Sequence, residues 1–470
     1  MGSDFKTYSI SDIGEIVTGK TPPARIEGAF SSSNGMPFIT PKDMDGRRWI
    51  EHTERYLTVD GVESVKRNII PAGSVSVSCI GSDMGKAILV RRDSVTNQQI
   101  NTIIVDEKKF NPIFVYYALS IKQQYLKDIA GGSATPILNK SDFGKVTFNA
   151  PSKEHQDLIV KYLNCLDKKQ ELNRQINQTL EQMAQALFKS WFVDFDPVVD
   201  NALDAGFFEQ NSDLPEELLR RAEQRNIVRE QPNFKPLPAE TRQLFPAAFE
   251  ECEEPSLGLG GWVPKGWGAV TIKSLCVKTQ NGGTPKRANS EYWDDGDIPW
   301  LTSGEVRQSI ITHVENRITK IGLDNSSAKW IPVYSTLVAL YGATAGEVSI
   351  NALSLTSNQA VCALIPKDGY CWFNYLFVKS KTKLMQNNAV GSAQQNISKR
   401  LVEDLVVLSP TFNVATYFNS LVSDFFIKNI SNSKQIQLLS NLRDTLLPKL
   451  ISGELRLNND GTLASGNTDC

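Results

Sequence analysis

Two kinds of hydrophobic pattern follow one another along the chain. In residues 1–150 and 262–410, short alternating runs such as "SVSVSCI" and "TLVALYG" lie between Gly, Pro and Asn residues, which is typical of strand-rich domains with irregular loops. After Pro151 and after Pro410, apolar residues recur instead at helical spacing over about 35 residues. The pattern therefore predicts a strand-rich domain followed by a long helix, twice over.

Each predicted helix carries a narrow apolar seam, which is typical of a partner in a two-helix coiled coil. Ser152, just before the first helix, is a suitable N-cap. The first seam contains Tyr162, Leu166, Ile176, Leu180, Met183 and Leu187, with Lys169 and Asn173 as polar interruptions. The second contains Phe425, Ile436, Leu439, Leu446 and Leu450, with Asn429 and Asn432 within it. We expect the helices to pair with one another; the alternative is that each seam packs on its own domain.

The two predicted domains also repeat one another in sequence. "GKTPPAR" returns as "GGTPKRA", and "PFIT" returns as "PWLT". Further along, "IIPAGSVSVSCIGSDMG" returns as "WIPVYSTLVALYGATAG", "VTNQQ" as "LTSNQA", and "GGSATPILNK" as "VGSAQQNISK". Because the order is kept and each pair is separated by about 260 residues, the chain contains a duplicated domain.

The stretch "GEIVTGKT", from Gly14 to Thr21, fits the P-loop pattern G-x-x-x-x-G-K-[ST] of nucleotide-binding proteins. A P-loop needs a buried strand before the glycines and a helix that begins at the lysine. Two prolines follow Thr21, and the residue before a proline is pushed out of the helical region. In the second copy, Gly283 replaces Lys20. We therefore expect a loop beside a strand, with an NTPase as an alternative function.

Composition indicates a globular protein with several domains, since the chain has 470 residues. No apolar run reaches the length of a membrane helix and the N-terminus lacks the build of a signal peptide, so a cytoplasmic location is expected. The seven cysteines show no C-x-x-C spacing, which favours reduced thiols. The three histidines lie far apart in the sequence and predict no metal site.

Charge is unevenly distributed along the chain. The formal net charge is -2, which gives no overall attraction to nucleic acid. Residues 200–258 carry many more acids than bases, whereas residues 1–150 and 262–410 carry a small excess of bases. The distribution therefore permits DNA contact by the two repeated domains.

The sequence is most specific near the ends of the two predicted helices. "ALFKSWFVDFDPV" (186–198) and "TLLPKLISGELRL" (445–457) resemble the ends of the conserved helical regions in specificity subunits of type I restriction–modification enzymes. "LFPAAFEE" followed by "GWVPKGW" resembles that family's entry into its second recognition domain, and GxTP, "SNQA" and GSxxxxI elements recur in the family. The resemblance covers nearly the whole chain. In the acidic segment 200–236 the sequence does not match that of the family, and we predict no structure for this segment.

The resemblance implies two target-recognition domains of α/β (α+β) fold. They would be separated by two long antiparallel conserved helices that form a coiled coil, with pseudo-two-fold symmetry. The implied segments are recognition domain 1 at 1–150, conserved helix 1 at 151–193, a central linker at 194–261, recognition domain 2 at 262–410, conserved helix 2 at 411–457 and a tail at 458–470.

The resemblance further implies a subunit without catalysis of its own that reads double-stranded DNA. Because the two recognition domains differ in sequence, the target should be bipartite and asymmetric. Implied partners are two modification subunits, which carry S-adenosylmethionine and methylate adenine, and restriction subunits that use ATP and Mg. No cofactor is expected on this chain, which has no N/D-P-P-Y/F motif, and no membrane is expected. The alternative is a duplicated rigid scaffold that binds protein or glycan.

Base reading needs side chains that present donors and acceptors in a groove, chiefly Arg, Lys, Asn and Gln. Such residues gather in the repeated loops. The candidates for DNA binding in the first domain are Lys20, Thr21, Lys42, Arg47, Arg48, Asn97, Gln98, Gln99, Ser133, Asn139 and Lys140. In the second they are Thr284, Lys286, Arg287, Thr302, Ser303, Arg307, Asn358, Gln359, Ser392, Gln394, Gln395, Asn396 and Lys399. The alternative is that Asn residues form turns and lysines a solvated face.

Large apolar side chains near the two helix ends are candidates for receiving a partner subunit. They are Trp191, Phe192, Phe195, Leu447 and Leu450. The alternative is that these side chains belong to the hydrophobic core of this chain.

Overall fold

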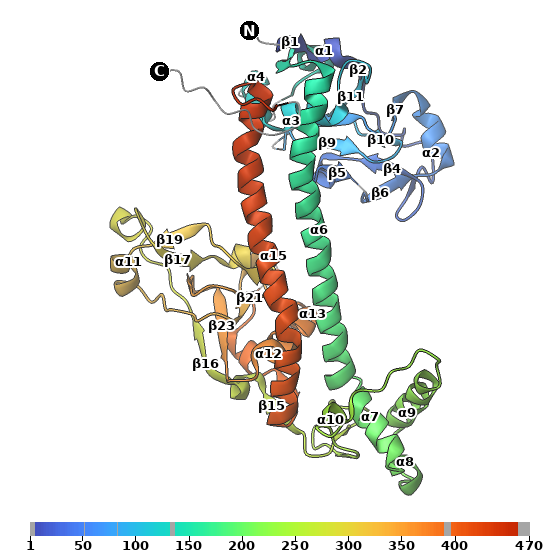
Figure 1. The fold of residues 1–470 in the computed structure, drawn as a ribbon, viewed down its shortest axis with the longest axis vertical. Coiled ribbons are helices and arrows are strands. Elements are labelled where there is room, and N and C mark those ends of the chain that lie inside the picture. The colour runs from blue at the N-terminus through green and yellow to red at the C-terminus, as the bar shows by residue number, and fades with distance from the viewer. Residues whose placement is uncertain (1–4, 51, 82, 132–136, 390–395, 459–470) are drawn as a thin grey trace. The chain divides into compact units, whose positions relative to one another are not determined.

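The computed structural model divides into two compact units, which hold one repeated domain each (Figure 1). Unit 1 comprises Met1–Glu171 and Gln437–Cys470, and unit 2 comprises Leu172–Ile436. The residues that the structure describes are 5–50, 52–81, 83–131, 137–389 and 396–458. Each unit also contains part of both long helices, because the division passes through the middle of each helix.

The recognition domain of unit 1 contains two mixed sheets. The first has the strand order β2 (Gly14–Thr18), β11 (Ile100–Val105), β8 (Val75–Ser78), β9 (Ala87–Val90), β5 (Trp49–Ile50). The second has the order β3 (Phe30–Ser31), β6 (Arg55–Leu57), β4 (Met36–Ile39), β10 (Ser94–Thr96), β7 (Ile69–Ile70). Strand β1 (Lys6–Ser9) pairs with β12 (Thr147–Ala150). The helices are α1 (Ile10–Ile13), α2 (Val59–Ser64), α3 (Pro112–Ser120), α4 (Gln123–Ile129) and α5 (Lys140–Lys145).

Unit 2 repeats this arrangement. Its larger sheet has the order β16 (Cys276–Asn281), β23 (Val361–Pro366), β20 (Thr336–Ala339), β21 (Val348–Asn351), β18 (Ile310–Ile311). Its smaller sheet has the order β19 (Asn316–Ile318), β17 (Ile298–Leu301), β22 (Thr356–Ser357), and β15 (Gly268–Thr271) pairs with β24 (Val406–Ser409). The helices are α11 (Lys320–Asp324), α12 (Cys371–Ser380), α13 (Thr382–Asn387) and α14 (Lys399–Glu403). The strand order of the larger sheet matches that of the first sheet of unit 1, so the predicted duplication is confirmed.

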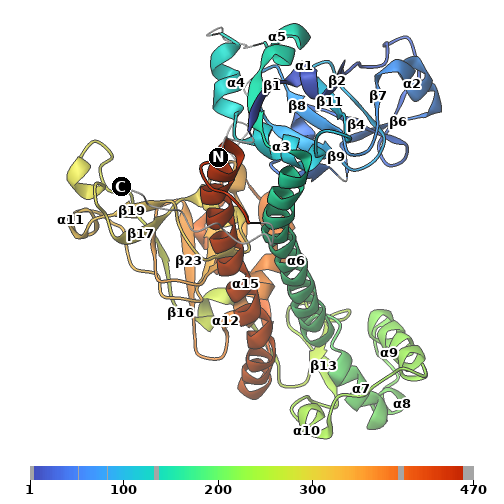
Figure 2. The same ribbon diagram turned by 45° about the horizontal axis from the view of Figure 1, so that its top comes forward.

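The two long helices are α6 (Lys153–Phe192) and α15 (Phe412–Ser452). The Ser152 hydroxyl accepts a hydrogen bond from the His155 amide at 3.4 Å, as the predicted N-cap requires. Neither helix contains Pro or Gly except Pro448 near the end of α15, so the only backbone hydrogen bond that proline removes from either helix lies close to that end. In Figures 1 and 2 the two helices lie side by side.

Polar side chains in unit 2 show that the helices pair antiparallel. Asn173 Nδ2 on α6 donates to Gln435 Oε1 on α15 at 2.7 Å. One turn further along α6, Asn177 Nδ2 donates to the carbonyl of Asn429 at 3.3 Å and receives a hydrogen bond from Asn432 on its own side-chain oxygen. Because the residue number rises in α6 while it falls in α15, the predicted antiparallel pairing is confirmed. Buried amides of this kind fix the register of paired helices.

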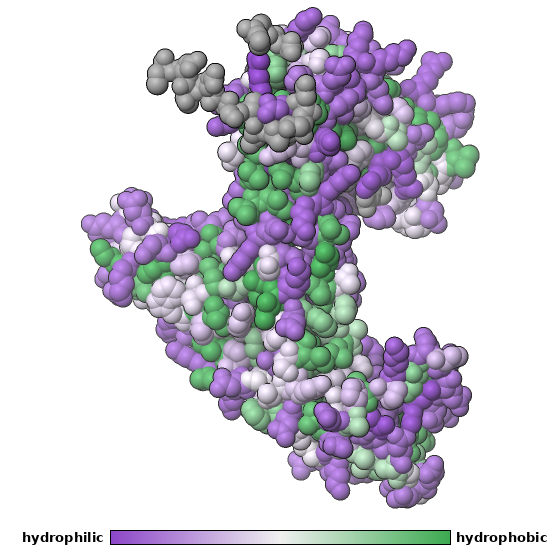
Figure 3. Space-filling view, viewed as in Figure 1, coloured by the Kyte–Doolittle hydropathy of each residue, from purple (hydrophilic) through white to green (hydrophobic). Residues whose placement is uncertain are grey.

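The acidic segment after α6, which the sequence left open, folds as a helical module. Its helices are α7 (Asp196–Asp204), α8 (Phe207–Gln210), α9 (Glu216–Arg229) and α10 (Ala239–Arg242), and the short strands β13 (Phe249–Glu251) and β14 (Trp262–Pro264) follow. Aspartates one turn apart on α7 face arginines one turn apart on α9, in the pairs Asp196–Arg221, Asp200–Arg225 and Asp204–Arg229. The two helices lie together in both ribbon views (Figure 2), and hydrophilic residues cover much of the visible face of this module (Figure 3).

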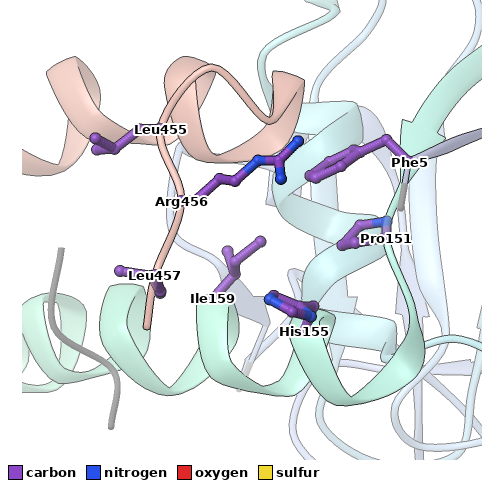
Figure 4. A pocket seen from close by; sticks show the side chains of 7 residues that line it. All are labelled: Phe5, Pro151, His155, Ile159, Leu455, Arg456 and Leu457. Atoms are coloured by element: carbon purple, nitrogen blue, oxygen red, sulfur yellow. The ribbon is translucent and has the colours of Figure 1, made fainter. Parts of the chain in front are cut away.

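The chain folds back on itself after α15 in unit 1. Gly453 has a φ of 80°, a left-handed conformation that favours glycine at a helix end, and an added Cβ atom would meet the ring of Phe5. Leu457 is buried in the same core as the start of α6. Figure 4 shows a small pocket where the end of the described chain packs against the start of α6. The pocket is lined by Phe5, Pro151, His155, Ile159, Leu455, Arg456 and Leu457.

Candidate nucleic-acid interface

Three of the nominated loops meet at one edge of a sheet in unit 1. Strands β4 and β10 are parallel neighbours with Val95 opposite Phe38, so their carboxyl ends lie at the same edge. The Asn97 amide donates to the carbonyl of Ile39 at 3.0 Å, and the Lys20 amide donates to the carbonyl of Thr96 at 2.8 Å. The GxTP loop, the loop after "PFIT" and the "TNQ" turn are therefore neighbours.

The same three loops meet in unit 2. Strands β17 and β22 are parallel with Leu301 opposite Ser357, and the Asn358 amide donates to the carbonyl of Leu301 at 3.0 Å. The Gly283 amide donates to the carbonyl of Ser357 at 2.8 Å. A Cβ atom on Gly282 would lie 1.9 Å from that carbonyl oxygen, so the double glycine before "TP" is needed for the close approach of the two backbones.

A threonine–glutamine hydrogen bond links two of these loops in each domain. Thr21 Oγ1 donates to Gln98 Oε1 at 2.7 Å, and Thr284 Oγ1 donates to Gln359 Oε1 at 2.6 Å. Both glutamines are exposed. The neighbouring asparagines form the turns themselves, since Asn97 Oδ1 accepts from the Gln99 amide and Asn358 Oδ1 from the Ala360 amide. The threonines and glutamines therefore stand at the surface on a backbone that the asparagines hold.

The loop after "PFIT" or "PWLT" begins with a capping threonine in each domain. Thr302 donates through both its amide and its hydroxyl to Glu305, as Thr40 does to Asp43. Thr302 is thus engaged in a capping box, and Ser303 beside it is half-buried. Exposed cations follow in both loops, namely Lys42 and Arg47 in unit 1 and Arg307 in unit 2, with Arg47 paired to Asp45.

The GSxxxxI segments adjoin the same edges through backbone hydrogen bonds. In unit 1 the Leu138 amide donates to the carbonyl of Cys79, whose own amide donates to the carbonyl of Gln99. In unit 2 Ile397, Leu340 and Ala360 form the same chain of bonds. Asn139 caps α5 by accepting from the Asp142 amide, and Lys140 and Asn396 are exposed. The nominated residues Ser133, Ser392, Gln394 and Gln395 lie outside the described residues.

Arg48 is engaged inside unit 1, which corrects its nomination as a DNA-binding residue. Its guanidinium donates to Tyr117 Oη at 2.8 Å, to Asn164 Oδ1 at 2.8 Å and to Asp167 Oδ2 at 3.1 Å, and its side chain is 15% exposed. Asn164 and Asp167 belong to α6, and Arg443 of α15 also reaches Asp167 at 3.1 Å. Arg48 therefore joins the recognition domain to the helix pair.

Lys399 is engaged in a similar way in unit 2. Its Nζ donates to the carbonyl of Thr279 at 3.1 Å and forms an ion pair with Glu403 at 3.1 Å. Desolvation raises the pKa of Glu403, but hydrogen bonds from Thr279, Lys399 and Lys273 outweigh it and lower the pKa to about 2. Lys399 therefore serves a charge network that fastens α14 to β16 and η3 (Ile272–Leu275).

The five residues nominated for partner binding are buried in the cores of this chain, which corrects that interpretation. Trp191 and Phe192 pack against Phe418 of α15, with ring centroids 5.7 and 4.8 Å apart, all within unit 2. Phe195 is 2% exposed, and Leu447 and Leu450 lie in the core of unit 1. Their apolar surface is covered by the chain's own helices and sheets, so it is not available to a partner in this conformation.

The residues that fit the P-loop pattern do not form one. Gly14–Thr18 is strand β2, and Gly19 to Pro23 follow without helical structure. The Lys20 amide, which a phosphate site would need, donates instead to the carbonyl of Thr96. The next described α-helix is α2, which begins at Val59, so the NTPase alternative lacks its structural basis.

Two arginines at the candidate interface lie over aromatic rings. Arg287, nominated from the sequence, covers Trp293 and Trp300. Arg55, which sequence reasoning missed, covers Phe30 and Phe38 in the same way. No motif marks Arg55, and only the pairing of β6 with β4 places it opposite Phe38.

Neither a metal cluster nor a membrane helix is found in the part of the chain that the structure describes. The described residues contain no group of three or more His, Cys, Asp or Glu side chains placed to hold a metal ion. Among the described helices, none is long and apolar enough to cross a membrane.

A mixed α/β domain that occurs twice, with two long antiparallel helices and matching loop clusters, defines a class of DNA-specificity protein. The family model of the type I restriction modification DNA specificity domain matches residues 2–182 and 264–411, and this chain belongs to that family. The two matches cover both recognition domains. The helical module from α7 to α10 lies outside them.

Similar proteins match this chain over nearly its whole length. The HindI specificity subunit of Haemophilus influenzae is 31% identical over 96% of this chain and 100% of its own length. The MjaIX specificity subunit of Methanocaldococcus jannaschii is 25% identical over 97% of this chain and 94% of its own. The crystal structure of the S subunit of a type I restriction-modification system from M. genitalium has a similar fold, with a TM-score of 0.54 and 15% identity over 95% of this chain and 96% of that one.

Proposed function

We propose that this chain is the non-catalytic DNA-reading subunit of a type I restriction–modification complex and that it reads a bipartite, asymmetric target. The observation that carries the proposal is the loop cluster that occurs once in each recognition domain. The backbone of the cluster is the same in both domains, down to the Thr21–Gln98 and Thr284–Gln359 hydrogen bonds. The side chains around it differ, so each domain presents its own set of donors and acceptors to a groove.

The partners that we propose follow from this role. Two modification subunits would bind the chain, carry S-adenosylmethionine and methylate an adenine in each half-site. Restriction subunits would join that assembly and use ATP and Mg. We propose no cofactor on this chain itself, and we expect it to act in the cytoplasm, where its DNA target and these partners are found.

The chain alone should bind DNA weakly. Its net charge is -2, and sequence-independent attraction to a duplex depends on Lys and Arg that neutralise phosphates. Tight and sequence-specific binding is therefore expected only when the modification subunits add their own DNA contacts. Titration of a duplex library with the chain alone and with the chain in complex measures this difference.

The decisive experiment is to map methylated adenines in a host that carries this chain and its modification subunit. We expect one motif made of two different short half-sites with an unread spacer of fixed length. A single continuous motif, or equal sequence-specific affinity for DNA with and without the modification subunit, would contradict the proposal.

A further inference from the structure

An arginine covers an edge-to-face pair of aromatic rings in each recognition domain. In unit 1 the guanidinium of Arg55 lies 4.6 Å from the ring centre of Phe30 and 5.2 Å from that of Phe38. In unit 2 the guanidinium of Arg287 lies 4.1 Å from the ring centre of Trp293 and 4.9 Å from that of Trp300. The ring pairs have centroids 5.2 and 5.0 Å apart, so the two domains share one arrangement.

The two arginines come from different places in the duplicated sequence. Arg55 lies opposite Phe38 in the β4–β6 pairing, and the residue opposite Trp300 in the β17–β19 pairing is Asn316. Arg287 follows "GGTPK" in the GxTP loop, where the first domain has Ala24. Both domains therefore place a guanidinium over the ring pair, although the two arginines occupy different positions in the repeated sequence. This points to a function of the guanidinium itself.

Both guanidinium groups have unused hydrogen-bond donors. Arg55 and Arg287 are exposed, and no acceptor for their side-chain N–H groups lies among the described residues. A guanidinium that stacks on a ring is held flat, and its donors then point outward in one plane. Two parallel donors in a fixed plane match an acceptor that offers two atoms side by side.

The backbone beneath each arginine is also held in place. Trp300 Nε1 donates to the carbonyl of Gly283 at 2.9 Å, and Trp293 Nε1 donates to the carbonyl of Lys286 at 3.2 Å. The rings under Arg287 therefore fasten the loop on both sides of Thr284. Arg55 stands on β6, which pairs with both β3 and β4. Such fixing reduces the entropy lost when a ligand is bound.

We propose that Arg55 and Arg287 each read a guanine through the major groove, one in each half-site of the DNA target. The inference rests on the proposed function and names the base and the residue. Guanine presents O6 and N7 side by side, and bidentate arginine is the commonest specific contact to it. A phosphate contact would need only the charge, whereas the aromatic rings fix the plane of the guanidinium, which matters for a bidentate contact to a base.

Arg→Lys substitutions test this, because lysine keeps the charge and loses the planar fork. The chain is expressed with its modification subunit, and the methylated adenines of the host genome are mapped for wild type, Arg55→Lys and Arg287→Lys. The wild-type motif should contain a G·C pair in each half-site. Each variant should relax that pair in its own half-site by about ten-fold or more and leave the other half-site intact.

Arg317→Lys is the matched control. Arg317 is an exposed arginine on β19, but its guanidinium donates to the carbonyl of Asp297 at 2.8 Å, so its substitution should leave the motif unchanged. A uniform loss of methylation at all sites with an unaltered motif would identify phosphate contacts and overturn the inference, as would a half-site without a G·C pair. Absence of any sequence-specific methylation with the wild-type chain would instead overturn the proposed function.

Discussion

Thr284 Oγ1 donates a 2.6 Å hydrogen bond to Gln359 Oε1, and this bond joins two loops that are 75 residues apart in the sequence. The equivalent bond of 2.7 Å joins Thr21 to Gln98, which are 77 residues apart. Both recognition domains keep this contact although the side chains around it differ. We therefore assign the threonine–glutamine bond to a common framework, on which each domain presents its own side chains. It fixes the orientation of the glutamine amide.

Replacing Thr284 with Val should therefore alter recognition more than stability. Valine keeps the shape of the side chain but cannot donate, so Gln359 loses its orientation. Because the bond is at the surface, we expect the free energy of unfolding to change by less than about 1 kcal/mol. We expect base preference to broaden in one half-site when the complex selects from a random DNA library. Thr21→Val is the matched variant and should broaden the other half-site; broadening of both half-sites by either variant would contradict the framework role.

Asp167→Asn should destabilise unit 1. The Asp167 carboxylate is 14% exposed and accepts from Arg48, Arg443 and Tyr117, the last at 2.5 Å. Burial and the Asp167 charge raise the pKa of Tyr117 well above its usual range, so the phenol stays protonated and donates. Without the carboxylate, Arg48 loses its counter-charge and Arg443 keeps only its ion pair with Asp444 among the described residues. We expect a loss of about 3 kcal/mol in the free energy of unfolding, measured in urea.

The control for Asp167→Asn is Asp324→Asn in the exposed Lys320–Asp324 pair of α11, whose side chains are 72% and 56% exposed. A solvated pair contributes little, so this change should cost less than about 0.5 kcal/mol. Equal effects of the two substitutions would show that the Asp167 network does not anchor the recognition domain.

Arg225→Ala should destabilise the helical module of unit 2. Arg225 donates to both oxygens of Asp200 at 2.8 and 2.7 Å, and the Asp200 side chain is 8% exposed. Among the described residues, Arg229 at 3.9 Å is then the one remaining cation near this buried carboxylate, and we expect a loss of about 3 kcal/mol or more in the free energy of unfolding. The double variant with Asp200→Ala should lose less than the sum of the single changes. Arg220→Ala, at an exposed position of the same helix, should change the free energy of unfolding by less than about 0.5 kcal/mol.

Acid should weaken unit 2 through Glu403. The pKa of this carboxyl falls from 4.5 to about 2 in the folded chain, so its contribution to stability is present above pH 4.5 and is lost as the pH falls from 4.5 towards 2. Urea unfolding over that pH range should therefore show a steeper loss for wild type than for Glu403→Gln. Parallel pH profiles would mean that the ion pairs with Lys399 and Lys273 do not stabilise the folded chain.

Much of the architecture could be predicted because local patterns determine it. The helix period after Pro151 and Pro410, the N-cap at Ser152 and the repeat at a constant separation are all properties of neighbouring residues or of self-comparison. The loop beside a strand that was expected at Gly14–Thr21 is confirmed by β2 and the residues after it, and the turns that Asn97 and Asn358 form are the alternative that the sequence offered for these asparagines. What these residues bind in DNA stays a prediction.

The tertiary structure decided which polar side chains remain available. Arg48 directly precedes the short strand β5 and Arg55 begins the short strand β6 of the same domain, and no local pattern distinguishes the two arginines. Arg48 points to Asp167, more than one hundred residues away, whereas Arg55 lies over Phe30 and Phe38 with its donors unused.

The same holds for the apolar residues at the helix ends and for the acidic segment. Trp191 is a large aromatic residue of the kind that is enriched in partner-binding sites. Only the packing of Phe245 and of Phe418 on α15 against it shows that it is covered. The aspartates of α7 contribute to the acidic stretch that the sequence shows. Only the folded chain reveals that arginines of α9 form ion pairs with these aspartates and so balance their charge. Sequence alone determined the duplicated domains and their helices, because periodicity and turn chemistry are local. The long-range pairing that exposes one arginine and buries another was decided by the fold.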